Sequence, residues 1–305
     1  MLRRHSQAGT TQAHVSTQDN PTETLVVCMR GMRKLNVRPS LPLYIAQLWE
    51  RRNFIVTDAR FRAFRTAKSY HLWRFWLIAQ PMLDAAMYGL IFGFLLKTSR
   101  GVENFIGFLI LGVTFFGFMT SLVNGGQSLI QTSKNLIQAF SFPKATLVLS
   151  QSLRYLIDNL PALLVAVFVA LGTQWGKPLS WTIILVVPLT LLMWAFGTGL
   201  MFIIARITSF LPDFKVLISV GLRAWFFSSG IFFPLERFAH SPFLYDLFSL
   251  NPGYLFLDAV RGAVLYSTAP SLARWLTLAS WGVGLLLVGL VFFWRAEERY
   301  INVRQ

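Results

Sequence analysis

Charged residues are scarce in this chain of 305 residues. Only 13% are Asp, Glu, Lys or Arg and 54% are apolar, whereas an ordinary soluble domain carries about 25% charged residues. The mean hydropathy of +0.53 agrees with this composition. Both values indicate that lipid, and not water, surrounds most of the chain, and they argue against an ordinary soluble domain.

Acidic residues are the scarcer of the two charges, with 13 Asp and Glu against 28 Lys and Arg, which leaves a formal net charge of +15. In a soluble protein such an excess suggests nucleic acid as a partner. In a membrane protein it sets the orientation instead, because Lys and Arg gather on the cytoplasmic side. We therefore expect membrane lipids as partners and no nucleic acid.

Cysteine and histidine are too few for a disulfide framework or a metal site. Cys28 is the single cysteine, and the four histidines are scattered without ligand spacing. The sequence also lacks a Gly-rich phosphate loop, a Gly-x-Ser-x-Gly elbow and a His-Glu-x-x-His motif. We expect no metal, cofactor or enzymatic activity in this chain. Such absences are typical of a transport subunit whose motor is a separate chain.

Long apolar runs are what the chain has instead. At 1.5 Å per residue, six segments are long enough for a hydrocarbon layer about 30 Å thick. They predict an all-α integral membrane protein with six transmembrane helices. The expected spans are residues 75–96, 105–123, 155–171, 181–207, 216–233 and 276–294.

The distribution of charge predicts the topology. Before the first expected span there are 13 Lys and Arg against 4 Asp and Glu, and Arg295, Arg299 and Arg304 follow the last span. An even number of spans places both ends of the chain on one side of the membrane. The positive-inside rule makes that side the cytoplasm. The expected location is the bacterial plasma membrane.

Two segments precede the first span. Residues 1–40 are polar in their first part and are expected to form a disordered cytoplasmic tail. From Leu41, apolar residues recur at helical spacing through Tyr44, Ile45 and Leu48, and a basic stretch with Arg60, Arg62, Arg65 and Lys68 follows. We expect an amphipathic helix in the membrane interface with its cations toward lipid headgroups. The alternative is a helix on a soluble surface.

Residues 234–275 contain two short apolar pieces, 242–250 and 253–266, which are separated by Asn251-Pro252. Neither is long enough to cross the membrane. On the expected topology both face outward, and we expect them to dip back as re-entrant helices, which requires shielding by protein or water. A soluble cap is the alternative.

Two charges inside expected spans, Asp84 and Arg223, are candidates for function because such charges are costly in lipid. They either line a polar conduit or form a structural ion pair. Aromatic residues cluster in the second and fifth spans, and their faces suit either sugar rings or helix packing. These candidates are Phe115, Phe116, Trp225, Phe226 and Phe227.

The loop after the second span contains a short apolar helix that Pro143 ends. It is either a knob that docks a cytoplasmic partner or an ordinary connecting helix. The residues proposed for coupling are Asn135, Leu136, Ile137, Phe142, Pro143 and Lys144.

Taken together, residues 41–299 resemble the membrane subunits of type-2 ABC exporters, in the branch that exports polysaccharides, O-antigens and teichoic acids. The resemblance rests on the order and spacing of weak motifs. The first motif is a basic amphipathic segment that is followed by Gln80-Pro81 and then by Ile91-Phe92-Gly93. The others are the 135–144 loop, Asp213 before the fifth span, and Asn251-Pro252 followed by Arg261. The chain departs from that pattern in its long polar N-terminal tail.

The resemblance implies that two copies of this chain pair with two ATP-hydrolysing subunits, which hold the ATP and magnesium. It also implies a lipid-pyrophosphate-linked glycan as the substrate. Guanidinium groups suit that pyrophosphate, and the candidates are Arg60, Arg62, Arg65 and Arg74. Asn251, Pro252 and Arg261 join Arg223 and the aromatic residues as candidates for the channel or its gate.

The leading hypothesis is therefore a permease, residues 41–305, that exports a lipid-linked polysaccharide. One alternative is a type-2 permease for a small drug or lipid. Another is a membrane-embedded glycosyl- or acyltransferase, which would need polar residues that converge at one membrane depth, and the sequence offers only isolated ones.

Overall fold

The computed structural model describes residues 39–69, 73–91, 104–174, 180–234 and 248–302. The expected N-terminal tail lies almost entirely outside these residues. Every regular element in the described part of the chain is helical. The elements are α1 (Leu41–Glu50), α2 (Arg52–Ser69), α3 (Trp73–Tyr88), α4 (Phe105–Gly126), α5 (Leu129–Thr132), α6 (Lys134–Ala139), α7 (Ala145–Gly172), η2 (Trp181–Leu185), α8 (Val186–Phe210), α9 (Phe214–Ser228), α11 (Pro252–Leu265), α12 (Leu272–Trp294) and η4 (Glu297–Asn302).

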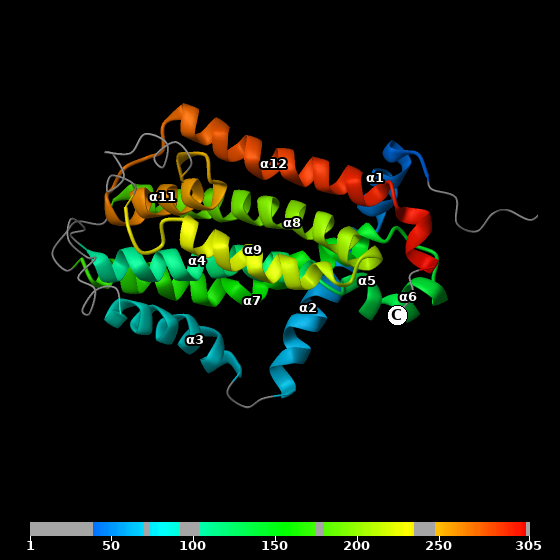
Figure 1. The fold of residues 1–305 in the computed structure, drawn as a ribbon, viewed down its shortest axis with the longest axis horizontal. Helices are drawn as coiled ribbons and strands as arrows, with labels where there is room; N and C mark the ends of the chain where they lie inside the picture. Colours follow the sequence, from blue (N-terminus) through cyan, green and yellow to red (C-terminus); the bar gives the residue numbers. More distant parts are fainter. Residues whose placement is uncertain (1–38, 70–72, 92–103, 175–179, 235–247, 303–305) are drawn as a thin grey trace, which may run out of the picture. The chain divides into compact units, whose positions relative to one another are not determined.

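Four of these helical segments are long and apolar enough to cross a membrane, and they run along the length of the fold (Figure 1). They are Phe105–Gly126, Ala145–Gly172, Trp181–Phe210 and Leu272–Trp294. Helix α12 packs lengthwise on α8, and α4 packs on both α7 and α8. These helices confirm the all-α membrane protein that the hydropathy predicts, and they match four of the six expected spans.

The prediction for the third span places its start too late in the sequence. Helix α7 starts at Ala145 and not near residue 155, so the polar stretch that reads as a loop is its first turns. The structure satisfies these polar groups within the protein: the Ser150 hydroxyl donates to the Asp58 carboxylate, and Arg154 pairs with Asp158 at 3.2 Å. A hydropathy window misses this extension because the polar residues lower its mean.

The prediction for the fifth span is wrong about where the helix ends. Helix α9 stops at Ser228, so it has 15 residues, which at 1.5 Å each span roughly 22 Å. Gly230 then adopts a φ of +63°, which turns the chain, and Ile231 and Phe232 fold back into the core. The structure describes the first expected span only as far as residue 91. This part consists of α3 and a short π-helical turn after it.

Helix α11 corresponds to the second of the two short pieces. Asn251 caps its N-terminus by accepting from the Gly253 N–H at 2.9 Å, and Pro252 occupies the first turn. Most of its side chains are buried, and it packs against α4 and α8. Most of the first piece, 242–250, lies outside the described residues.

Buried side chains form two separate clusters. The larger one surrounds α4 and includes α11. The smaller one, called the second core below, lies at the end of the bundle where α1, α5, α6 and η4 meet (Figure 1). Its members are Tyr44, Leu48, Leu129, Ile130, Ile137, Phe142, Ala145, Leu147, Val148, Met201, Phe202, Ala205, Phe293, Ala296 and Tyr300.

Candidate functional site

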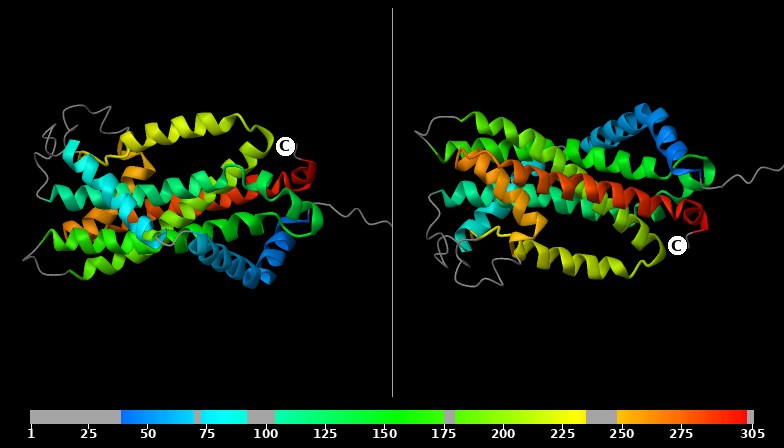
Figure 2. Two further views of the ribbon diagram at one scale, coloured as in Figure 1. Left: turned by 90° about the horizontal axis from the view of Figure 1, so that it is seen from below. Right: turned by 90° about the horizontal axis from the view of Figure 1, so that it is seen from above.

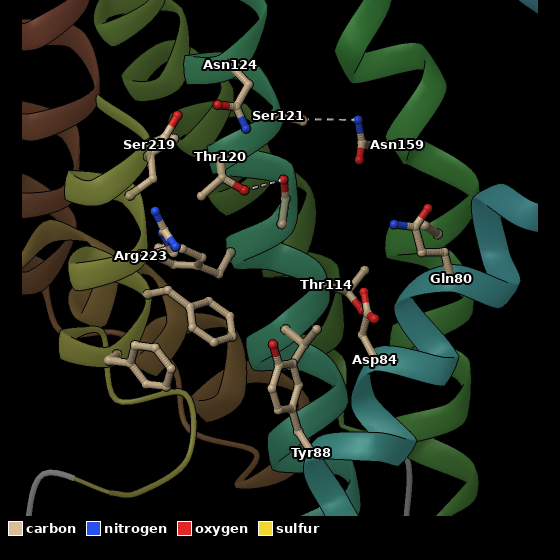
Figure 3. Close-up of a pocket in the computed structure, with 17 residues that line it drawn as sticks. Gln80, Asp84, Tyr88, Thr114, Thr120, Ser121, Asn124, Asn159, Ser219 and Arg223 are labelled. Carbon is tan, nitrogen blue, oxygen red and sulfur yellow. Dashed lines mark hydrogen bonds between the residues drawn. The ribbon is translucent and has the colours of Figure 1, made fainter. Parts of the chain in front are cut away.

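A cavity of about 810 Å³ lies between α3, α4, α7 and α9 (Figure 3). Its lining combines amide and hydroxyl groups, two opposite charges and several aromatic rings. The polar lining residues are Gln80, Asp84, Tyr88, Thr114, Thr120, Ser121, Asn124, Asn159, Ser219 and Arg223, and the aromatic ones besides Tyr88 are Phe116, Phe226 and Phe227. Polar groups that look isolated in the sequence therefore line one cavity in the fold.

Helical spacing places these groups on facing sides. On α3, Gln80, Asp84 and Tyr88 are separated by four residues each, so they share one face. On α4, Thr120 and Asn124 repeat the same spacing. Helices α7 and α9 contribute Asn159 and Arg223 from two further walls (Figure 3). Apart from the two charges and the aromatic residues, sequence reasoning missed this lining, although the polar stripe on α3 is readable.

Most hydroxyl and amide groups of the lining have partners within the protein. Thr120 donates to the Gly117 carbonyl at 3.0 Å, and Ser121 donates to the Phe118 carbonyl at 2.7 Å. Asn159 donates to the Ser121 hydroxyl at 3.3 Å. Thr114 differs, because its hydroxyl oxygen is buried and has no hydrogen-bond partner within the described residues. A buried hydroxyl without a partner is costly, which marks this point of the wall as one that suits a bound polar group.

Asp84 and Arg223 line the same cavity from α3 and α9. No ion pair joins them among the interactions of the described residues. The structure therefore does not support the expectation of a structural Asp–Arg pair. Both charges instead line the cavity.

The predicted aromatic residues divide between the two sides of α9. Phe226 packs against Phe116, with ring centroids 5.5 Å apart, on the side of the polar cavity, and Phe227 lines the same cavity. Trp225 faces a second, almost wholly apolar groove of about 380 Å³ between α9, α8 and α12. Phe115 is fully buried in the larger core. Phe116, Phe226 and Phe227 are thus the predicted aromatic residues that the cavity brings together.

Asn251, Pro252 and Arg261 lie outside the polar cavity. Asn251 accepts from the Trp225 indole N–H at 2.9 Å and donates to the Ser228 carbonyl at 2.9 Å, so it ties the end of α9 to the start of α11. Pro252 borders the apolar groove. These contacts hold the α9–α11 connection, and a gating role for these residues stays a prediction.

Arg261 is 2% exposed and anchors the same connection from the other side. Its guanidinium donates to the carbonyls of Phe108, Gly230 and Ile231 at 3.1, 2.9 and 3.2 Å. The cation also lies 3.4 Å from the centroid of the Phe108 ring. Two of its donors therefore serve the carbonyls of Gly230 and Ile231, which lie in the turn after α9, and the third binds the Phe108 carbonyl of α4.

The expected coupling segment contains the short helix α6, which ends at Ala139, before Pro143. Asn135 and Gln138 are exposed, and Phe140 is 63% exposed. Ile137 and Lys144 are buried, as are Phe142 and Pro143, and Leu136 is half-buried. One side of the segment is therefore exposed and the other side is packed against the rest of the protein. A segment that docks a partner needs this arrangement.

The four predicted pyrophosphate ligands do not line the cavity in the described part of the structure. Arg60 is exposed on α2, and Arg62 pairs with Asp58 at 2.9 Å. Arg65 and Arg74 belong to α2 and α3, but their side chains lie outside what the structure describes. Their role stays a prediction.

Long apolar helices around a cavity with charged, amide and aromatic walls define an integral membrane protein with the features of a transport subunit. Comparison with known families gives the more specific assignment. Residues 52–265 match the family described as ABC-2 type transporter, and the chain belongs to that family.

Two curated relatives carry the same name, O-antigen export system permease protein RfbA. The relative from Myxococcus xanthus is 24% identical over 75% of this chain and 84% of its own length. The relative from Klebsiella pneumoniae is 25% identical over 77% of this chain and 89% of its own length. These similarities support a type-2 ABC permease in the polysaccharide export branch.

Proposed function

We propose that this chain is the permease of an ATP-driven exporter that moves a lipid-linked polysaccharide across the bacterial plasma membrane. The observation that carries the proposal is the cavity between α3, α4, α7 and α9, whose walls combine Asp84, Arg223, amide groups and aromatic rings. The names of the two relatives support the same substrate class. The polymer is of the O-antigen, galactan, capsular or teichoic-acid type.

The chemistry of the walls suits a sugar chain. Sugar hydroxyls donate to carboxylate and amide oxygens, and Asp84, Asn124 and Asn159 offer such acceptors. The C–H faces of sugar rings pack against aromatic rings, and the half-buried Phe226 and the exposed Phe227 supply them from α9. A polymer that slides needs many weak contacts of this kind and no deep binding site.

The proposed topology has six spans, with α3 and α9 added to the four long helices. The second core faces the cytoplasm together with both ends of the chain, because the excess of Lys and Arg lies there. Helix α11 dips into the membrane from outside. The burial of α11 against α4 and α8 supports this, since a non-spanning segment at membrane depth must be shielded by protein.

A second copy of the chain completes the path in this proposal. Helix α9 lies at the edge of the bundle (Figure 2) and has no buried residue. Val216 and Leu217 are 71% and 62% exposed on it. A partner copy against α3 and α9 would close the cavity on its open side. Two ATPase subunits, which carry ATP and magnesium, dock on the exposed face of α6 and Phe140.

The basic residues before the first span meet the substrate first. Arg60, Arg62, Arg65 and Arg74 are the candidates for the pyrophosphate at the cytoplasmic entrance, because guanidinium binds phosphate oxygens with two parallel donors. Within the described residues the lining has one cation, Arg223, which would then be the next positive group along the path.

The test is depletion of the protein in its native cell, followed by analysis of lipid-linked glycans on each face of the plasma membrane. A polyprenyl-linked polymer that accumulates on the cytoplasmic face supports export and identifies the substrate. Unchanged surface glycans without accumulation would overturn the polysaccharide proposal and favour a permease for a small drug or lipid. The apolar groove at Trp225 would then be the place to examine for such a ligand.

A further inference from the structure

The N-terminus of α7 is capped by residues from distant parts of the chain. Lys144 is the capping position, and no side chain of its own segment fills that role. The Lys144 N–H instead donates to Oε1 of Glu297 at 2.8 Å, and the Ala145 N–H donates to the Tyr44 hydroxyl oxygen at 3.0 Å. Glu297 is 153 residues away and Tyr44 is 101 residues away. A carboxylate here also complements the positive end of the helix dipole.

The three side chains close a network on one carboxylate. The Tyr44 hydroxyl donates to Oε2 of Glu297 at 2.8 Å, and the Lys144 ammonium lies 3.5 Å from Oε1. Tyr44, Glu297 and Lys144 are 0%, 4% and 5% exposed. Because the network is buried, each partner that is lost leaves another polar group without compensation.

This network lies where three functional segments meet. Tyr44 belongs to the N-terminal helix α1, Lys144 ends the expected coupling segment, and Glu297 begins the C-terminal helix η4. Helix α6 packs against η4, and Arg51 after α1 reaches the Ser141 carbonyl at 3.5 Å. The surrounding apolar side chains are those of the second core.

Helix α7 connects the network to the cavity. It runs from Ala145 to Gly172 with Pro161 inside it, and Asn159 on the cavity wall lies 14 residues after Ala145, before the proline. At 1.5 Å per residue this is about 21 Å along the part of the helix that precedes Pro161. A displacement of the first turn of α7 is therefore transmitted to the wall that bears Asn159.

We infer that Glu297, held by Tyr44 and Lys144, is the positioning residue that couples movement of the α6 segment to α7 and so to the cavity. The role rests on the proposed function, because it requires an ATPase subunit that pushes on α6 and Phe140. Glu297 fixes the junction between the coupling segment and α7 to η4, and Tyr44 fixes α1 to the same junction. The three segments then move as one body when the partner pushes.

The experiment uses the full-length permease with its ATPase partner in sealed proteoliposomes that contain lipid-linked glycan. The readout is the coupling ratio, the amount of glycan translocated per ATP hydrolysed, together with the amount of bound partner. Tyr44→Phe removes the bridging hydroxyl alone, and Glu297→Gln removes the charge and keeps the shape. Tyr300→Phe is the matched control, because its hydroxyl lies in the same core but donates to the Phe293 carbonyl.

We expect both test variants to bind the partner normally and to lower the coupling ratio roughly tenfold, the factor that one hydrogen bond to a charged group is worth. Tyr300→Phe and the exposed Glu50→Gln keep the wild-type ratio. A wild-type ratio in both test variants overturns the coupling role while the exporter itself stands. If Glu297→Gln does not accumulate in the membrane, Tyr44→Phe alone decides. If wild-type vesicles translocate no glycan with ATP, the proposed function fails and this role fails with it.

Discussion

Asp84 on α3 and Arg223 on α9 line the same cavity, and no ion pair joins them within the described residues. Two opposite charges at membrane depth normally pair to reduce the cost of burial. Here both charges are left to water or to a ligand in the cavity. This separation distinguishes a binding surface from a structural brace.

Neutral substitutions of these two residues test that distinction. We expect Asp84→Asn and Arg223→Gln each to lower glycan export about tenfold or more, because each removes a charge-assisted hydrogen bond to the passing substrate. Partner-dependent ATP hydrolysis is expected to persist, whereas a membrane-embedded transferase would lose all turnover. The measurement is export and ATPase activity in the same vesicles.

A double variant that exchanges the charges of Asp84 and Arg223 is the control. If the two residues acted as an ion pair, the double variant Asp84→Arg with Arg223→Asp would keep that pair, but it would not keep a surface shaped for a substrate. We expect no recovery of export relative to the single variants. Recovery of both export and thermal stability in the double variant would mean that the two residues act as a pair.

Thr114→Val tests the hydroxyl without a partner in the cavity wall. Because Val has nearly the same shape and no polar group, we expect the free energy of unfolding to rise by about 1 kcal/mol and export to fall. Thr146→Val is the matched control, since its buried hydroxyl also lacks a partner within the described residues but lies outside the cavity lining. It should stabilise the protein without changing export. Equal export in both variants would exclude Thr114 from substrate contact.

Arg261→Met is expected to destabilise the chain strongly. The substitution keeps much of the volume but leaves the carbonyls of Phe108, Gly230 and Ile231 without their donor. We expect the free energy of unfolding to fall by about 3 kcal/mol or more, because each buried carbonyl that loses its donor costs about 1–3 kcal/mol. Arg261→Lys should recover only part of it, because an ammonium cannot reproduce the geometry of the guanidinium. Melting of the detergent-solubilised protein measures both, and an unchanged Tm for Arg261→Met would contradict this account.

The pKa of the Glu297 carboxyl group leads us to expect that the stability of the protein depends on pH. Burial raises the pKa of its carboxyl group, an effect that nearby Lys144 and the donated hydrogen bonds from Lys144 and Tyr44 only partly oppose. Tyr300 is the further titratable group beside it, and its own pKa is raised by burial and by Glu297. A raised pKa in the folded state means that folding makes this carboxyl group easier to protonate than it is in the unfolded chain. The contribution of this group to stability is therefore fully present below its unfolded pKa and is lost as pH rises through the raised value.

The measurement is the difference in unfolding free energy between wild type and Glu297→Gln across that pH window. Because glutamine cannot ionise, the variant should lack this one component of the pH dependence. Wild type should thus lose stability relative to the variant as the pH rises from the ordinary glutamate pKa toward neutrality. A difference that stays constant with pH would show that burial does not raise the pKa of Glu297.

The sequence predicts the long helices well and their ends poorly. Runs such as the one in α4 are apolar over a whole span, so composition alone identifies them. The start of α7 is hidden because Ser150 and Arg154 are polar, and their partners lie on α2 or one turn further along. The end of α9 depends on the left-handed conformation of Gly230, which no apolar pattern announces.

The cavity was predictable only in its parts. The repeat of Gln80, Asp84 and Tyr88 places a polar stripe on α3, and Arg223 stands out as a charge in an apolar helix. Which stripes face one another depends on how the helices pack, and that information is not local. The Tyr44–Glu297 hydrogen bond illustrates the same limit, because its two residues are 253 positions apart.

The central claim is that the polymer passes along the cavity between α3 and α9. The most direct measurement uses a lipid-linked glycan that carries a thiol-reactive group, which is cross-linked during ATP-driven export to single cysteines placed in a Cys28→Ser background. Asn124→Cys and Ser219→Cys report on the cavity, and Phe168→Cys, at a side chain that is 70% exposed on α7 and outside the cavity lining, is the control. We expect ATP-dependent cross-links at the two cavity positions and none at position 168. Cross-links that are absent from the cavity, or equal at all three positions, would contradict this path.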